Sequence, residues 1–188
     1  MEAMPIGEGF PQVLGAARTG AEWAWRVLYR DLAPVVSGYV RSRGAREPDD
    51  VCGEVFVEVA RGLPRFEGDE AGFRSWVFVI AHHRLLDERR RARRHPEYPV
   101  VSEVFGAERA PEDVEATALD RISSERVREI IEQLTPDQCD VLLLRILGGL
   151  TVEEVARAVG KRPGAVKALQ RRGLEAIRRL MQELGVTL

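Results

Sequence analysis

Apolar side chains return with helical spacing in two separate blocks of this 188-residue chain, and that pattern restricts the fold to packed helices. Within residues 23–94 and 127–184 they recur at the period of an amphipathic helix. The segment between the blocks contains prolines and no such period, and residues 95–124 carry two basic and seven acidic residues. An acidic segment of this kind favours a linker. The sequence therefore predicts an all-α fold of two small helical domains joined by a flexible acidic linker.

The same patterns set the expected domain boundaries. The first residues are rich in Gly and Ala and show no sustained period, which is typical of a mobile terminus. We expect a mobile N-terminal tail at 1–20, a first helical domain at 21–95, the linker at 96–123 and a second helical domain at 124–188. Pairs with the spacing of a capping box predict helix starts at Thr19–Glu22, Thr135–Gln138 and Thr151–Glu154.

Residues 151–172 have the anatomy of a helix-turn-helix. A short helix carries the small residue Ala156 where helices must pack closely, Gly160 marks the turn, and a second, basic helix follows. Basic and amide side chains at the start of such a helix match the acceptors and donors of phosphates and base edges in a major groove. The alternative is an ordinary helical hairpin with a solvated basic face.

The first domain carries a different combination of side chains. Phe73, Trp76 and Phe78 lie close in the sequence to His82, His83 and a run of arginines that ends at Arg94. Aromatic rings beside cations suit unpaired bases, because each base offers a face for stacking and a phosphate for neutralisation. The spacing of Phe73 and Trp76 also fits a core stripe, so burial is the competing interpretation.

Several classes of protein are disfavoured. No stretch approaches the roughly 20 apolar residues of a membrane span, and no secretory signal is recognisable, so we expect no membrane insertion and a cytoplasmic location. Cys52 and Cys139 lie far apart within apolar patterns, which disfavours a disulfide or a zinc site, and we expect neither a metal nor a cofactor. His82 and His83 are adjacent on a helix and have no nucleophile or carboxylate pair beside them, so we expect no catalytic residue and no enzyme.

Longer motifs resemble a known family. Residues 49–56 (DDVCGEVF) and 73–87 (FRSWVFVIAHHRLLD) resemble region 2 of bacterial sigma-70 family sigma factors. The second half of the chain is similar to region 4 of the extracytoplasmic-function (ECF, group 4) type, with LTPDQ at 134–138, VLLLR at 141–145, LTVEEVA at 150–156 and GAVK at 164–167. The two blocks occur in the order of that family, without room for a region 3 domain between them.

The resemblance implies an RNA polymerase sigma factor, a protein that acts by binding and not by catalysis. Such a protein binds core RNA polymerase, through its beta and beta-prime subunits, and directs promoter-specific initiation. The first domain would capture the melted strand of the −10 element, and the second would recognise the −35 element as duplex. Many members of the family are held inactive by an anti-sigma factor, so we expect one as a partner here.

The resemblance also assigns roles by position. The residues that match the polymerase-clamp helix are Asp49, Asp50, Val51, Glu54 and Val55. The residues that match the −10 DNA-binding stretch are Trp76, His82, His83, Arg84, Asp87, Arg90 and Arg91. The residues that match the −35 DNA-binding helix are Arg162, Gly164, Ala165, Lys167, Ala168, Gln170 and Arg171.

The chain departs from the family pattern at two places. His83 stands where many members have an Asn that recognises a flipped base, which predicts an unusual −10 preference. The turn 161–163 (KRP) replaces the common apolar residue and Ser or Thr cap, so the register of the −35 helix stays open.

Two other functions compete with the sigma hypothesis. A one-component helix-turn-helix regulator would bind duplex DNA without polymerase, but it needs no acidic clamp helix and no first domain with aromatic and Arg side chains. A sigma-like decoy would bind a regulator and no promoter, but it would be expected to lose the basic clusters that this chain keeps.

Overall fold

The computed structural model describes residues 6–94, 130–131 and 133–183, and every regular element in these ranges is helical, as the sequence predicts. The elements in chain order are the 3-10 turn η1 (Gly7–Gly9), α1 (Phe10–Arg18), α2 (Glu22–Ser42), α3 (Pro48–Gly62), the 3-10 turn η2 (Leu63–Arg65), α4 (Glu70–Arg94), α6 (Pro136–Ile146), α7 (Val152–Ala158) and α8 (Pro163–Glu183). The predicted linker, 96–123, lies outside the described residues.

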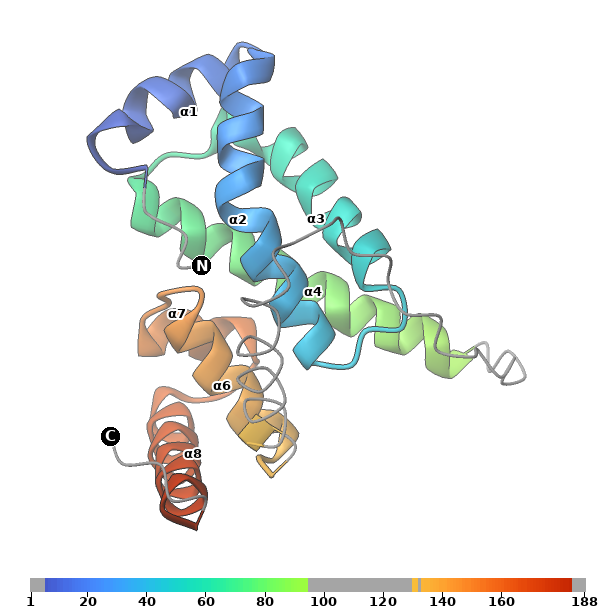
Figure 1. Ribbon diagram of the computed structural model, residues 1–188, viewed down its shortest axis with the longest axis vertical. Coiled ribbons are helices and arrows are strands. Elements are labelled where there is room, and N and C mark those ends of the chain that lie inside the picture. The colour runs from blue at the N-terminus through green and yellow to red at the C-terminus, as the bar shows by residue number, and fades with distance from the viewer. Residues whose placement is uncertain (1–5, 95–129, 132, 184–188) are drawn as a thin grey trace, which may run out of the picture.

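Helices α2, α3 and α4 pack against one another, and α1 packs against α2 (Figure 1). Apolar residues spaced by three or four positions give α2 and α4 one buried face each, and α3 closes the bundle with a third. The fully buried side chains include Leu28, Val36, Val55, Phe78 and Leu85. α2 continues through Pro34 without a break.

The N-terminal helix α1 is the main difference from the sequence-based expectation. We expected a mobile tail over 1–20, but η1 and α1 occupy Gly7–Arg18, and Phe10, Val13 and Leu14 are buried. The Glu70 carboxylate accepts hydrogen bonds from the backbone N–H groups of Ile6 and Gly7, at 2.6 and 2.8 Å. The short apolar stripe of α1 is masked in the sequence by Gly and Ala, which carry little periodic signal.

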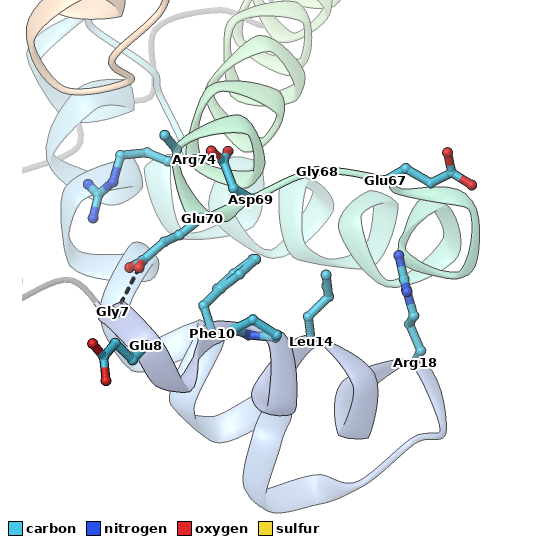
Figure 2. A pocket seen from close by; sticks show the side chains of 12 residues that line it. Gly7, Glu8, Phe10, Leu14, Arg18, Glu67, Gly68, Asp69, Glu70 and Arg74 are labelled. Atoms are coloured by element: carbon cyan, nitrogen blue, oxygen red, sulfur yellow. Dashed lines mark hydrogen bonds between the residues drawn. The ribbon is translucent and has the colours of Figure 1, made fainter.

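A hollow of about 910 Å³ separates α1 from the loop before α4. Figure 2 shows Phe10, Leu14 and Arg18 on the α1 side and the loop from Glu67 to Glu70 on the other. The Arg18 guanidinium also donates a hydrogen bond to the carbonyl of Phe66, so α1 is tied to this loop at both of its ends.

The start of α2 also differs from the prediction. Thr19 does not cap it: its hydroxyl donates to the carbonyl of Ala16 at 2.8 Å and closes the end of α1. Ala21 is the N-cap of α2 and makes no side-chain capping bond. The tight turn at Gly20, with φ of 84°, leaves Thr19 on the α1 side.

Helices α6, α7 and α8 form the second unit, which lies below α4 in Figure 1. Both capping boxes predicted here are present: Thr135 with Gln138 opens α6, and Thr151 with Glu154 opens α7. α6 and α8 approach closely at Gly173, where an added Cβ would lie 2.7 Å from Leu142 Cδ1. A larger residue at this position would push the two helices apart.

The two units share one apolar core. Phe78 of α4 belongs to the same buried cluster as Val141, Leu144 and Leu150 of the second unit. Gly148 lies directly against α4, because a Cβ there would stand 2.9 Å from the Phe78 Cβ. Within the described ranges, no helix has the length and apolar character needed to cross a membrane.

We predict that Phe10→Ala lowers the free energy of unfolding by about 3 kcal/mol, because it empties a buried site in the core. Phe10 is 3% exposed, and its ring centroid lies 5.6 Å from that of Phe73. Urea unfolding followed by circular dichroism measures the loss. Gln12→Ala, on the exposed face of the same helix, is the control, and equal stabilities for the two variants would show that α1 does not contribute to the core.

Candidate nucleic-acid interface

Helix α4 presents only part of the predicted −10 stretch at the surface. His83 is exposed, and Trp76, Arg84 and Asp87 are half-buried. Arg90 and Arg91 are exposed on the last turns. His82 is 2% exposed, so its ring is a core group in this arrangement of the chain and not a surface contact.

Trp76 packs into an aromatic cluster and keeps one edge accessible. Its ring stacks on Phe66, with centroids 5.1 Å apart and planes inclined by 22°. Gly62 allows this position, because a Cβ on Gly62 would lie 2.6 Å from the indole ring. Much of the Trp76 ring is therefore packed as a core residue would be. The edge that faces α7 remains accessible to solvent.

His82 and Tyr39 form a buried polar pair between α4 and α2. The Tyr39 hydroxyl and His82 Nδ1 share a hydrogen bond of 2.9 Å. Burial lowers the pKa of His82 below its ordinary value. Asp140 acts in the opposite direction, and the neighbouring His83, Arg43 and Arg89 lower the pKa of His82 further. His82 is therefore neutral at physiological pH.

Ion pairs join the predicted −10 stretch to the predicted clamp helix. Both terminal nitrogens of Arg91 donate to Glu54 at 3.1 Å, and Arg84 Nε donates to Glu58 at 2.6 Å. The hydrogen bond from Arg91 lowers the pKa of Glu54 below its ordinary value. These pairs connect α3 to the second half of α4, so the two surfaces that sequence analysis treats separately form one continuous polar face.

Four of the five predicted clamp residues divide into two groups, and the fifth, Glu54, is the half-buried partner of Arg91. Asp49 and Asp50 are exposed in the first turn of α3, where the helix dipole favours acidic side chains. Asp49 accepts a hydrogen bond from Arg41 at 2.8 Å. Val51 and Val55 are 3% and 0% exposed and pack in the core, so they position α3 and do not face a partner.

The predicted −35 residues lie together on the first half of α8. Arg162 is the residue before the helix, and Pro163 occupies its first position, where a missing N–H costs nothing. The exposed members of the set are Arg162, Gly164, Ala165, Lys167 and Arg171, and Ala168 and Gln170 are half-buried. Val166 is fully buried and anchors this end of α8 against the rest of the unit. The arrangement presents a basic helix start to solvent.

Two features near these surfaces have weak sequence signals. The hollow beside α1 depends on a helix that sequence analysis takes for a tail. A second cavity, of about 310 Å³, brings Trp76 and His83 of α4 together with Glu154 and Arg157 of α7, residues far apart in the sequence. Among the described residues, no group of three or more His, Cys, Asp or Glu side chains is arranged to hold a metal ion.

Comparisons with known proteins match each helical unit to a family. Residues 28–95 match the family described as Sigma-70 region 2, and residues 124–184 match Sigma-70, region 4. The ECF RNA polymerase sigma factor SigD of Mycobacterium tuberculosis (strain H37Rv) is 32% identical over 180 residues, covering 92% of this chain and 84% of that protein. The ECF RNA polymerase sigma factor ShbA of Streptomyces griseus is 33% identical over 184 residues, covering 91% of this chain and 96% of that protein.

Two solved structures share the fold. CnrH, in complex with the cytosolic domain of CnrY, has a TM-score of 0.60 and 20% identity, covering 94% of this chain and 99% of that one. The sigma factor RpoE of Bartonella quintana, in complex with the anti-sigma factor NepR, has a TM-score of 0.58 and 16% identity, covering 84% of this chain and 96% of that one.

The buried neutral His82 makes stability depend on pH. Because its pKa is lowered in the folded state, the unfolded chain takes up a proton at higher pH than the folded chain does. Above the ordinary His pKa of about 6.5, the folded state has its full stability with respect to this group. As the pH falls below that value, the free energy of unfolding decreases by up to about 1.4 kcal/mol per pH unit. Urea unfolding between about pH 7.5 and pH 5.5 measures this slope, and we predict that His82→Gln flattens it.

His83→Gln is the matched control for this prediction, because the neighbouring ring is exposed and its replacement should change the slope much less than His82→Gln does. A wild-type slope equal to that of His82→Gln would contradict the burial of a neutral imidazole at position 82.

Proposed function

The chain belongs to the sigma-70 family of RNA polymerase sigma factors, in its extracytoplasmic-function group, and from this we propose how its surfaces divide the work of initiation. The first helical unit binds core RNA polymerase and the melted strand of the −10 element. The second unit binds the −35 element as duplex DNA. Each step is an association in the cytoplasm, and no covalent bond of DNA is made or broken by this chain.

The exposed basic start of α8 is the observation that carries this proposal furthest. Arg162, Lys167 and Arg171 reach solvent from one end of a helix whose position is fixed by the buried Val166. Guanidinium and ammonium groups neutralise phosphates and donate to base edges, and a helix fits the width of the major groove. Gly164 and Ala165 leave room for close approach of the backbone, because they add little side chain at the first turn.

Support for −10 binding comes from the accessible part of α4. His83 is exposed beside the free edge of Trp76, and this combination suits a base that has left the duplex. Arg90 and Arg91 lie farther along the helix, where they are placed to meet the strand's phosphates. His82 supports this face from beneath through its bond to Tyr39.

Support for polymerase binding comes from the start of α3. Asp49 and Asp50 form an exposed acidic turn, and Glu54 extends the acidic face along the helix. A basic surface on the polymerase clamp, formed by its beta-prime subunit, would complement it. Contacts of the second unit with the beta subunit complete the proposed complex.

We also propose an anti-sigma factor as a partner of this chain. The support is that the RpoE structure with the same fold is a complex with the anti-sigma factor NepR. Such a partner would compete with polymerase for one or both helical units.

Transcription reconstituted from purified parts tests the proposal. We predict that the chain, added to core bacterial RNA polymerase and a genomic DNA library, produces transcripts with specific start sites. Arg171→Ala should lower their yield roughly tenfold, because it removes one phosphate or base contact from the −35 helix. Sequencing of the 5′ ends of the RNA identifies the start sites and their yields.

Arg178→Ala is the matched control, because it removes an exposed arginine from the same helix beyond the proposed reading face. Equal losses in the two variants would contradict the assignment of the α8 start. Binding of duplex DNA with no association with polymerase would overturn the sigma role and favour a one-component regulator.

Asp50→Lys tests the clamp surface separately. We predict a loss of polymerase affinity of at least roughly tenfold, because a like charge replaces a complementary one at an interface. Co-elution of the chain with core polymerase in size-exclusion chromatography measures binding. Glu153→Lys, an exposed acid in the first turn of α7, is the control, and undiminished co-elution of Asp50→Lys would place polymerase contact elsewhere.

A further inference from the structure

The loop that leads into α4 is tied to both ends of α1. At the start of α1, the Glu70 carboxylate accepts hydrogen bonds from the backbone N–H groups of Ile6 and Gly7. At the end of α1, the Arg18 guanidinium donates to the carbonyl of Phe66. Figure 2 shows Glu70 and Arg18 at opposite ends of the hollow of about 910 Å³. The position of the loop from Phe66 to Glu70 therefore depends on α1 at two points.

A row of four aromatic rings continues from α1 to Trp76. Between ring centroids, Phe10 lies 5.6 Å from Phe73, and Phe73 lies 5.8 Å from Trp76. Phe66 contacts the last two of these rings, at 5.3 Å from Phe73 and 5.1 Å from Trp76. Trp76 thus rests on the side chain of Phe66, the residue whose carbonyl accepts the hydrogen bond from Arg18.

Two glycines define the space around this stack. A Cβ on Gly62 would lie 2.6 Å from the Trp76 indole, and a Cβ on Gly68 would lie 3.0 Å from the Phe66 ring. Gly68 also has a φ of 155°, which a residue with a side chain rarely adopts. Trp76 is therefore packed between the end of α3 and the loop, and a shift of the loop moves the surface on which its ring rests.

We propose that α1 is a positioning element for DNA binding: its two ties hold the loop from Phe66 to Glu70, and Phe66 in turn fixes the orientation of Trp76 toward an unpaired base. This inference rests on the proposed function, in which Trp76 and His83 receive that base. Helix α1 lies before residues 28–95, which match Sigma-70 region 2. A ring that is already oriented loses less rotamer freedom when a base binds. Arg18 therefore acts on DNA through Trp76.

Binding of DNA by the holoenzyme, reconstituted from core polymerase and each variant, tests this role. The fork probe joins a duplex −35 element to an unpaired non-template −10 strand. The duplex probe carries the −35 element alone. Both sequences come from a promoter identified by the transcription assay, and fluorescence anisotropy of the labelled probes gives the affinities.

We expect Arg18→Ala to weaken binding of the fork probe about fivefold, part of what one stacked base contributes, and to leave binding of the duplex probe unchanged. Arg18→Lys should restore most of the affinity, because an ammonium group can donate to the Phe66 carbonyl. Glu70→Gln, which removes the charge and keeps the shape, should cause a smaller loss on the fork probe. Gln12→Ala, on the exposed face of α1, is the matched control and should bind both probes like wild type.

A double-variant cycle separates positioning from a structural role. Because Arg18 acts through Trp76, Arg18→Ala should cause no further loss in a chain that already carries Trp76→Ala. Additive losses overturn the inference. Circular dichroism melting of Arg18→Ala should match that of wild type, because Arg18 is exposed. A lower melting temperature with equal losses on the fork and duplex probes shows a purely structural role and also overturns the inference.

Failure of the proposed function gives a different result. If the DNA library yields no specific transcripts, or if Trp76→Ala binds the fork probe like wild type, the −10 role of this face is overturned and the inference falls with it. If Trp76→Ala weakens binding of the fork probe and Arg18→Ala does not, the −10 role stands and the positioning role of α1 alone is overturned.

Discussion

The burial of α4 between the other helices of its bundle and the second helical unit is the interaction on which the rest of this structure depends. Phe73, Val77 and Leu85 fix α4 to the bundle, while Phe78 also belongs to the core shared with the second unit. Helix α4 therefore packs apolar side chains against both the bundle and the second helical unit, and its polar face lies between these two contacts. The position of each proposed DNA-binding residue on α4 follows from this division.

Polar groups in the same region are satisfied in pairs, and this limits how they act. Tyr39 with His82, and Arg43 with Asp140, are buried combinations whose separation would leave a polar group without a partner. Arg91 with Glu54 is more exposed and is stabilised less by burial. The buried pairs stabilise the packing of the helices. The exposed pair is the one that we propose can separate, so that Arg91 binds a phosphate or Glu54 binds a polymerase side chain.

Much of this structure could be predicted from the sequence, because local signals and tertiary packing agree. The capping boxes at Thr135 and Thr151 are present as expected, and the helical class follows from periodicity. The sequence did not predict α1, whose few apolar residues are spread among Gly and Ala, nor the depth of His82, which depends on Tyr39 far away in the chain. Nor did it predict the contact of the two units, since no local pattern encodes the pairing of Arg43 with Asp140.

The most direct test of this account is a distance between the two units, measured by pulsed electron paramagnetic resonance with and without core polymerase. Spin labels at Gln12→Cys on α1 and Arg179→Cys on α8, both exposed positions, report it in a chain whose Cys52 and Cys139 are replaced by alanine. The account predicts one narrow distance in the free chain and a clearly different one when polymerase is bound. A distance that stays the same in the polymerase complex, or a broad distribution in the free chain, would contradict it.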